Sequence, residues 1–237
     1  MAGRSTKPGR TPRFMQPQEF EDEAALILAE YGRKKAPVTV PPIPIDEIVE
    51  EHFEIAVEIR DLRREYPEGD VLGAIYFNDK LIAVDQSLVP DDFPAMRSRY
   101  RFTLAHELAH WRLHRHLYLR QAGQKTIAAI NSTRPDHVLR SRQYDPKEVQ
   151  ANRLAACLLM PREMLKRGWH EQFGGMEPLY LDDLCRNASV AIGEMDEALF
   201  EDACRPLATM FEVSPESMRY RLVEMKLLQT KREPLLF

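Results

Sequence analysis

The sequence predicts an α+β fold that is mostly helical, with a small antiparallel sheet ahead of one central helix and a helical segment at the C-terminal end. Apolar residues recur at helical spacing near residues 18–33, 102–113 and 149–159. Residues 54–59, 71–77 and 80–84 instead have the alternation or apolar runs of strands. No repeat and no further strand pattern follows, so the remainder is predicted to be helical.

The N-terminal elements are predicted in order from the residues that begin and end them. Residues 1–17 are rich in Gly, Pro, Ser, Thr and basic side chains, which predicts a disordered basic tail. A helix over about 18–33 follows, and the proline cluster at 37–44 ends it. Ile45 opens a short helix. After the first strand, Asn78-Asp79 makes a compact hairpin turn between the second and third strands.

The central helix contains the motif H-E-x-x-H as His106-Glu107-x-x-His110. Residues four apart lie on one face of a helix, so the two histidines can bind one metal ion. Glu107 then borders the same ion, where it can accept a proton from a water molecule. A buried helix whose histidines only bond to carbonyls is the alternative, and a third metal ligand decides between the two.

Two residues compete to be the third ligand. His116 has the metzincin spacing, but Leu113 stands where that motif needs a glycine to end the helix. Glu148 lies in a second predicted helix, which begins with Asp145 as N-cap and Pro146 in its first turn. Asn152, four residues after Glu148, can orient a histidine ligand through its other ring nitrogen. We therefore predict a gluzincin-like set of His106, His110 and Glu148.

These two blocks resemble the ImmA/IrrE metallopeptidases. The chain has R-F-T-L-A-H-E-L-A-H-W-R-L-H and then E-V-Q-A-N-R-L-A-A-C-L-L-M-P. Ala109 replaces a common glycine of the family and Leu154 a common phenylalanine, and neither is a ligand. The resemblance implies His106, His110 and Glu148 as ligands and Glu107 as general base, with His114 as a structural or supporting residue. It also implies a zincin-like domain over 18–195 and a C-terminal helical, helix-turn-helix-like subdomain over 196–237 that packs on it.

The function implied by the resemblance is a zinc-dependent endopeptidase. Its expected substrate is a specific protein, typically a helix-turn-helix repressor in a stress-response or mobile-element system. The ion is expected to be Zn²⁺, and Mn²⁺ also suits histidine and carboxylate ligands. A second donor to the oxyanion is expected as well. Tyr76, His137 and His170 are the guesses for it.

Two segments are candidate docking sites for a protein substrate. The hairpin around Gly73 to Ala83 precedes the metal-binding helix, and an added substrate strand at such an edge is one interpretation. An ordinary core sheet is the other. The basic segment from His116 to Tyr144 is either a lid or binding loop or a solvated insertion.

The C-terminal segment has helix-turn-helix character. Ser214 is predicted to cap its last long helix with Pro215 in the first position. Arg219 and Arg221 could contact phosphate. The rival function is therefore a DNA- or partner-binding transcriptional regulator with a non-catalytic metal site, although we favour helices that pack on the catalytic part.

Composition limits the classes of partner and the cellular compartment that we expect for the protein. The chain has 237 residues, 44% of them hydrophobic, and a net charge of -4, which gives no general attraction to nucleic acid. It contains no apolar stretch long enough to span a bilayer, and no apolar region of a secretory signal follows the basic N-terminus. Cys157, Cys185 and Cys204 are an odd number, typical of reduced core residues in the cytoplasm. No feature specifies an oligomeric state.

Overall fold

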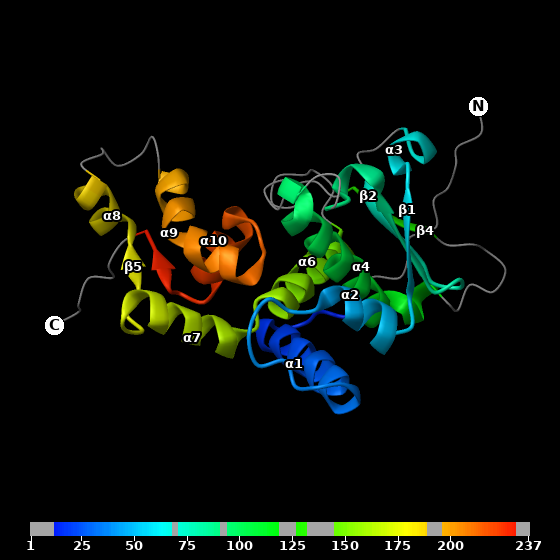
Figure 1. Ribbon diagram of the computed structural model, residues 1–237, viewed down its shortest axis with the longest axis horizontal. Helices are drawn as coiled ribbons and strands as arrows, with labels where there is room; N and C mark the ends of the chain where they lie inside the picture. Colours follow the sequence, from blue (N-terminus) through cyan, green and yellow to red (C-terminus); the bar gives the residue numbers. More distant parts are fainter. Residues whose placement is uncertain are drawn as a thin grey trace.

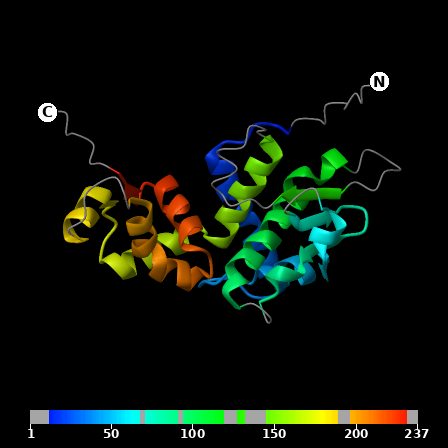
Figure 2. The same cartoon turned by 90° about the horizontal axis from the view of Figure 1, so that it is seen from above.

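The computed structural model has two groups of elements (Figure 1). One contains α1, α4, α6 and the larger sheet, and the other contains α7 to α10. The view from above shows the same separation (Figure 2). The structure describes the ranges 12–67, 71–90, 94–118, 127–131, 145–188 and 196–230. The α+β prediction is confirmed.

The N-terminal group begins with a long helix and a short, irregular one. α1 (Pro17–Lys34) starts at a capping box, in which Gln16 and Glu19 bond to each other's backbone. α2 (Ile45–Glu47) continues directly into a π-helical turn, Ile48–His52. Residues 12–16 were predicted to belong to a disordered tail, but Met15 is buried in the core, so that boundary was too late. Residues 1–11 lie outside the described range.

The larger sheet has four strands in the order β1-β3-β2-β4. Its strands are β1 (Ala56–Arg60), β2 (Val71–Tyr76), β3 (Leu81–Asp85) and β4 (Ile127–Asn131). β2 pairs antiparallel with β3 and β4, but β1 runs parallel to β3, so the prediction of a purely antiparallel sheet was wrong. The chain leaves β1 through α3 (Leu62–Glu65), and β3 then fills the place between β1 and β2. Alternation along a strand does not reveal this order of strands.

The order of the strands also changes which strand an extended substrate could pair with. Both strands of the hairpin lie inside the sheet, because β4 covers β2 and β1 covers β3. β4 belongs to the segment that sequence analysis interpreted as a lid or insertion. The rest of that segment, residues 119–126 and 132–144, lies outside the described ranges. An added substrate strand would therefore have to pair with β1 or β4.

Two long helices carry the polar residues of interest. α4 (Arg97–Tyr118) follows two short turns, Gln86–Leu88 and Pro94–Met96, and packs on one face of the sheet. α6 (Pro146–Leu159) lies against α4. Asp145 caps α6 by accepting a hydrogen bond from the Lys147 N–H, as the sequence predicted. Arg101 ties α4 to the segment before α2, because its guanidinium donates a hydrogen bond to the Ile43 carbonyl oxygen at 2.7 Å.

The second group is built from the last four helices and a two-stranded sheet. Its elements are α7 (Arg162–Phe173), β5 (Leu179–Tyr180), α8 (Leu181–Ala188), α9 (Asp196–Phe211), α10 (Pro215–Glu224) and β6 (Leu228–Gln229). β5 and β6 pair in parallel and were not predicted. The predicted boundary at residue 196 divides this group, since α7 already belongs to it (Figure 1). Gly168 of α7 has no side chain, and a Cβ there would lie 3.1 Å from Leu207 of α9.

The two arginines proposed for phosphate contacts face inward. Arg219 is 8% exposed and Arg221 is 1% exposed. Arg221 donates to Glu21 of α1 at 2.8 Å and to the Met160 carbonyl at the end of α6 at 3.2 Å. Ser214 caps α10 as predicted. The α9–α10 pair therefore fastens the second group to the first and does not offer these arginines to solvent.

Candidate metal centre

Three side chains from two helices meet at the contact between α4 and α6. His106 and His110 lie one turn apart on α4, and Glu148 comes from the first turn of α6. The possible ligand atoms of these three residues all lie within 4.8 Å of one another. The Glu148 carboxylate oxygens are 3.4 Å from His106 Nε2 and 3.5 Å from His110 Nε2. The structure thus brings together the three residues that the sequence indicated as ligands.

Hydrogen bonds at the outer ring nitrogens prepare both histidines for a metal. His106 Nδ1 lies 2.8 Å from Asn152 Oδ1, and an amide oxygen only accepts. His106 therefore carries its proton on Nδ1, and its Nε2 lone pair points toward Glu148. The prediction that Asn152 lies beside a histidine ligand agrees with this contact.

A longer chain of hydrogen bonds sets the tautomer of His110. Gln150 Nε2 donates to the Arg13 carbonyl oxygen at 2.7 Å, so Gln150 Oε1 faces His114 as an acceptor. His114 Nε2 donates to that oxygen at 3.0 Å, which leaves Nδ1 of neutral His114 as an acceptor. His110 Nδ1 lies 3.1 Å from it and must donate. The Nε2 lone pair of His110 is then free for a cation.

The resulting arrangement fits a cation better than it fits an empty site. The Nε2 atoms of His106 and His110 are 3.0 Å apart, and the tautomers above turn a lone pair of each toward the other. A carboxylate closes the third side. Electron-rich atoms that converge in this way repel one another unless a positive charge lies among them. Two imidazoles and one carboxylate are also the protein ligands of many catalytic zinc sites.

Burial and charge adjust the ionisation of the same residues. Burial lowers the pKa of His110 to about 4, although the nearby Glu148 carboxylate opposes this. Burial alone would raise the pKa of Glu148, but the adjacent His106 and His110 outweigh it and hold that pKa below its ordinary value. A neutral imidazole and an ionised carboxylate are the forms that bind metal.

Glu107 lies beside this group in an unusual environment. It is 1% exposed, and its Oε2 atom has no hydrogen-bond partner. Burial, assisted by the nearby Glu148 carboxylate, raises the pKa of Glu107 well above its ordinary value. Gly73 of β2 makes room for the side chain, because a Cβ at Gly73 would lie 2.6 Å from Glu107 Oε1. A buried carboxyl group without a partner is a recognisable mark of a functional site.

His116, the alternative third ligand, lies outside this group of residues, and the Tyr76 hydroxyl has other polar neighbours. α4 continues past Leu113, as that residue predicted, and His116 is exposed outside the ligand group. The Tyr76 hydroxyl lies near Tyr66 and Arg60, at 3.2 and 3.3 Å, as part of the small cluster around Leu62 and Ala74.

The other two guesses have no place in the described site. His170 is exposed on α7, in the second group of helices. His137 falls outside the described ranges. Neither the role of Gln150 nor the close approach of Gly73 to the Glu107 side chain was predicted from the sequence. Gln150 gave no signal because its role depends on the Arg13 carbonyl, 137 positions away.

A histidine pair on one helix, a glutamate from a second helix and a buried carboxyl beside them are the features expected of an H-E-x-x-H metallopeptidase. The chain belongs to the peptidase family described as the IrrE N-terminal-like domain, whose match spans residues 94–223. That span runs from just before α4 into α10, so it includes both ligand helices and the α9–α10 pair.

Two other comparisons add little. A Mycobacterium tuberculosis transcriptional regulator of known structure aligns with 93% of this chain at 14% identity and a TM-score of 0.42. The chain spans 54% of the length of that regulator. The comparison with curated proteins found no match. Within the described segments, none of the helices has the length and apolar character needed to cross a bilayer.

Proposed function

We propose that this protein is a zinc-dependent endopeptidase that cuts a specific protein. The observation that carries the proposal is the convergence of His106, His110 and Glu148 beside the buried carboxyl of Glu107, whose Oε2 atom has no hydrogen-bond partner. A structural zinc site normally has four protein ligands and has no use for a neighbouring acid. Three ligands and a proton acceptor are what hydrolysis requires.

Each residue has a defined task in this proposal. His106, His110 and Glu148 would hold the ion, which when bound polarises a peptide carbonyl and makes water more acidic. Asn152 and His114 keep the two imidazoles in the binding tautomer. Glu107 accepts the proton of the attacking water and returns it to the leaving amine. Its raised pKa suits a group that must take up a proton and then release it.

Zinc is proposed over manganese because of the donor set. Two imidazoles and one carboxylate are typical of zinc hydrolases, whereas manganese favours sites with more oxygen ligands. We place the protein in the cytoplasm, in keeping with three buried, free cysteines. The choice of zinc rests on ligand chemistry. It is tested by measuring the metal content of protein purified without added ions.

The proposed substrate is a helix-turn-helix repressor, cut to release stress-response or mobile-element genes. This follows the family resemblance. The rival interpretation, a DNA-binding regulator with a non-catalytic metal, has less support because Arg219 and Arg221 are buried. Loss of a gel shift on deletion of 200–237 would favour the rival.

The test is incubation of the zinc-loaded protein with the helix-turn-helix repressor encoded nearest to its gene, and with unfolded casein. Mass spectrometry identifies the products, and Glu107→Gln serves as the blank. We expect one or a few cuts in the repressor and little cleavage of casein. Rapid digestion of casein would instead indicate a general peptidase, and equal products from Glu107→Gln would refute the catalytic assignment.

A further inference from the structure

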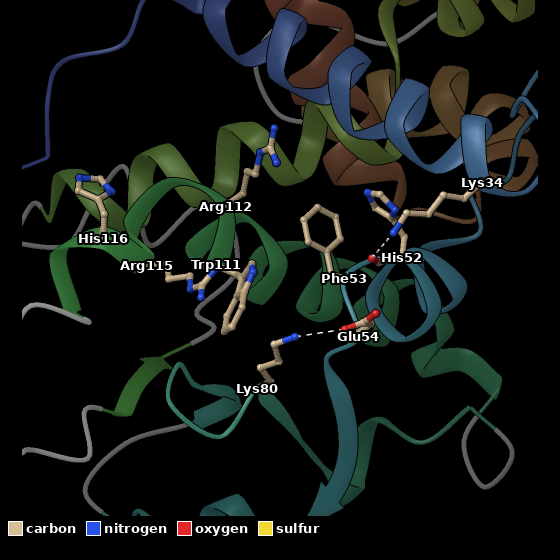
Figure 3. Close-up of a pocket in the computed structure, with 9 residues that line it drawn as sticks. All are labelled: Lys34, His52, Phe53, Glu54, Lys80, Trp111, Arg112, Arg115 and His116. Atoms are coloured by element: carbon tan, nitrogen blue, oxygen red, sulfur yellow. Dashed lines mark hydrogen bonds and ion pairs between the residues drawn. The ribbon is translucent and has the colours of Figure 1, made fainter. Parts of the chain in front are cut away.

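A basic pocket of about 720 Å³ is lined in part by the second half of α4 (Figure 3), and its lining does not include His106, His110 or Glu148. It is formed where the end of α1, the turn before β1, the β2–β3 turn and the second half of α4 meet. Its lining residues are Lys34, His52, Phe53, Glu54, Lys80, Trp111, Arg112, Arg115 and His116. Four of these are permanent cations and one is a carboxylate. The pocket is thus strongly biased toward a negatively charged occupant.

Only some of this positive charge is neutralised within the protein. Arg112 pairs with two glutamates of α1, and Lys80 pairs with Glu54 at 3.3 Å. Among the described residues, the Lys34 ammonium bonds to a backbone carbonyl, that of His52, at 3.4 Å, and to no carboxylate. Arg115 has no carboxylate partner among the described residues. Lys34 and Arg115 therefore remain available to bind carboxylates of another molecule.

Aromatic side chains give the pocket an apolar part. Trp111 is only 6% exposed and stacks against Phe77, with ring centroids 5.9 Å apart. The guanidinium of Arg115 lies over the Trp111 ring, 4.5 Å from its centroid, and this cation–π contact holds the charge in place. Phe53 is half-buried on the opposite side. An occupant that combines carboxylates with an apolar side chain would satisfy both parts.

A peptide fits this mixture better than nucleic acid does. Polyphosphate is recognised by continuous basic surfaces, but here Glu54 is exposed within the pocket, and the carboxylate of Glu51 borders Lys35 nearby. The net charge of -4 adds a general repulsion for DNA and RNA. A short acidic peptide segment can place a few carboxylates beside Lys34 and Arg115 without bringing them against Glu51 and Glu54.

We propose that the basic pocket is a docking site for an acidic segment of the protein substrate that also carries an apolar side chain. That the bound segment belongs to the substrate rests on the function proposed above. That the pocket binds an acidic segment does not. Arg115 and His116 lie one to two turns beyond His110 on the same helix. Docking here would use energy gained away from the scissile bond to position that bond at the metal centre. It would also make the enzyme selective.

The direct test measures binding in the full-length Glu107→Gln protein, where cleavage cannot interfere. The probe is a fluorescein-labelled peptide that alternates Glu with Leu and Phe, and its control has Gln at every Glu position. We expect anisotropy to report binding of the acidic peptide only, weakening with salt. Arg115→Glu combined with Lys34→Glu should reduce affinity by at least about 10-fold. Arg205→Glu combined with Lys166→Glu, at solvent-accessible positions of α9 and α7, is the matched control: it makes the same change of net charge and should leave affinity unchanged.

Three results would overturn the docking site: no binding of the acidic peptide, equal binding by the charge-reversed and control proteins, or tighter competition by duplex DNA than by peptide. The two proposals fail in distinguishable ways. Repressor cleavage whose KM is unaffected by Arg115→Glu refutes the pocket and leaves the peptidase standing. Acidic peptide binding without any cleavage supports the pocket and counts against the peptidase.

Discussion

The two ends of α6 take part in two buried polar clusters that differ in completeness. At its beginning, Glu148 joins His106 and His110, and Glu107 beside them keeps an oxygen without a partner. At its end, the Met160 carbonyl joins Arg221, whose other nitrogens bond to Glu21 and Glu224. We call the first cluster open, and we call the second closed because every guanidinium nitrogen of Arg221 is bonded. The unsatisfied oxygen of the open cluster belongs to the residue with the proposed chemical role, whereas Arg221 joins the two groups of helices.

The largest effect on stability should come from the closed cluster. Arg221→Ala leaves Glu21 buried with only Arg162 as a partner, so we expect unfolding to become easier by about 3 kcal/mol. Urea denaturation measures this. Arg205→Ala removes an exposed pair with Asp202 and should change stability by less than about 0.5 kcal/mol. A similar small change for both variants would show that the closed cluster contributes little to the fold.

A smaller loss is expected where the open cluster touches the sheet. A Cβ at Gly73 would lie 2.5 Å from Thr103 Cγ2 and 2.6 Å from Glu107 Oε1. Gly73→Ala should therefore cost about 1–3 kcal/mol and displace Glu107, reducing cleavage more than metal affinity. Gly175→Ala is the control, since a Cβ there meets only Glu177 N at 4.0 Å. Parallel losses of metal and cleavage would argue against a separate place for Glu107.

The hydrogen-bond chain behind His110 should have an effect on metal affinity alone. Gln150→Leu removes the acceptor for His114, and we expect zinc to bind about 10–100-fold more weakly. Gln150→Glu keeps an acceptor oxygen and should lose less. Competition with a chromophoric chelator gives both affinities. If the leucine variant binds zinc as tightly as the wild type, the chain does not control the His110 tautomer.

A further effect concerns the metal-free protein and pH. The pKa of His110 is about 4 in the folded protein, below its ordinary value of 6.5, so the unfolded chain takes up the proton first. This residue's contribution to stability is complete above pH 6.5 and is lost as pH falls toward 4. Denaturation at pH 7, 6 and 5 should show this loss in the wild type and a shallower one in His110→Gln. Identical slopes would contradict the shifted pKa.

Local patterns predicted the open cluster well. The four-residue spacing of His106 and His110, and the capping signal at Asp145, specify geometry within one helix or one turn. The resemblance then paired the two helices. Features that depend on long-range packing could not be predicted: β1 beside β3, the Gln150 bond to Arg13, and the inward direction of Arg221, which meets Glu21 200 positions away. An arginine on an amphipathic helix has the same sequence signature whether it faces phosphate or a buried carboxylate.

The central claim is that the open cluster is a metal centre with its proton acceptor outside the ligand set. Zinc titration by calorimetry, with elemental analysis, tests it on the wild type, Glu107→Gln, Glu148→Ala and His116→Ala. We predict one ion per chain with similar affinity in the wild type, Glu107→Gln and His116→Ala, and strongly reduced binding in Glu148→Ala. Loss of the ion in Glu107→Gln, or full affinity in Glu148→Ala together with loss in His116→Ala, would contradict the account.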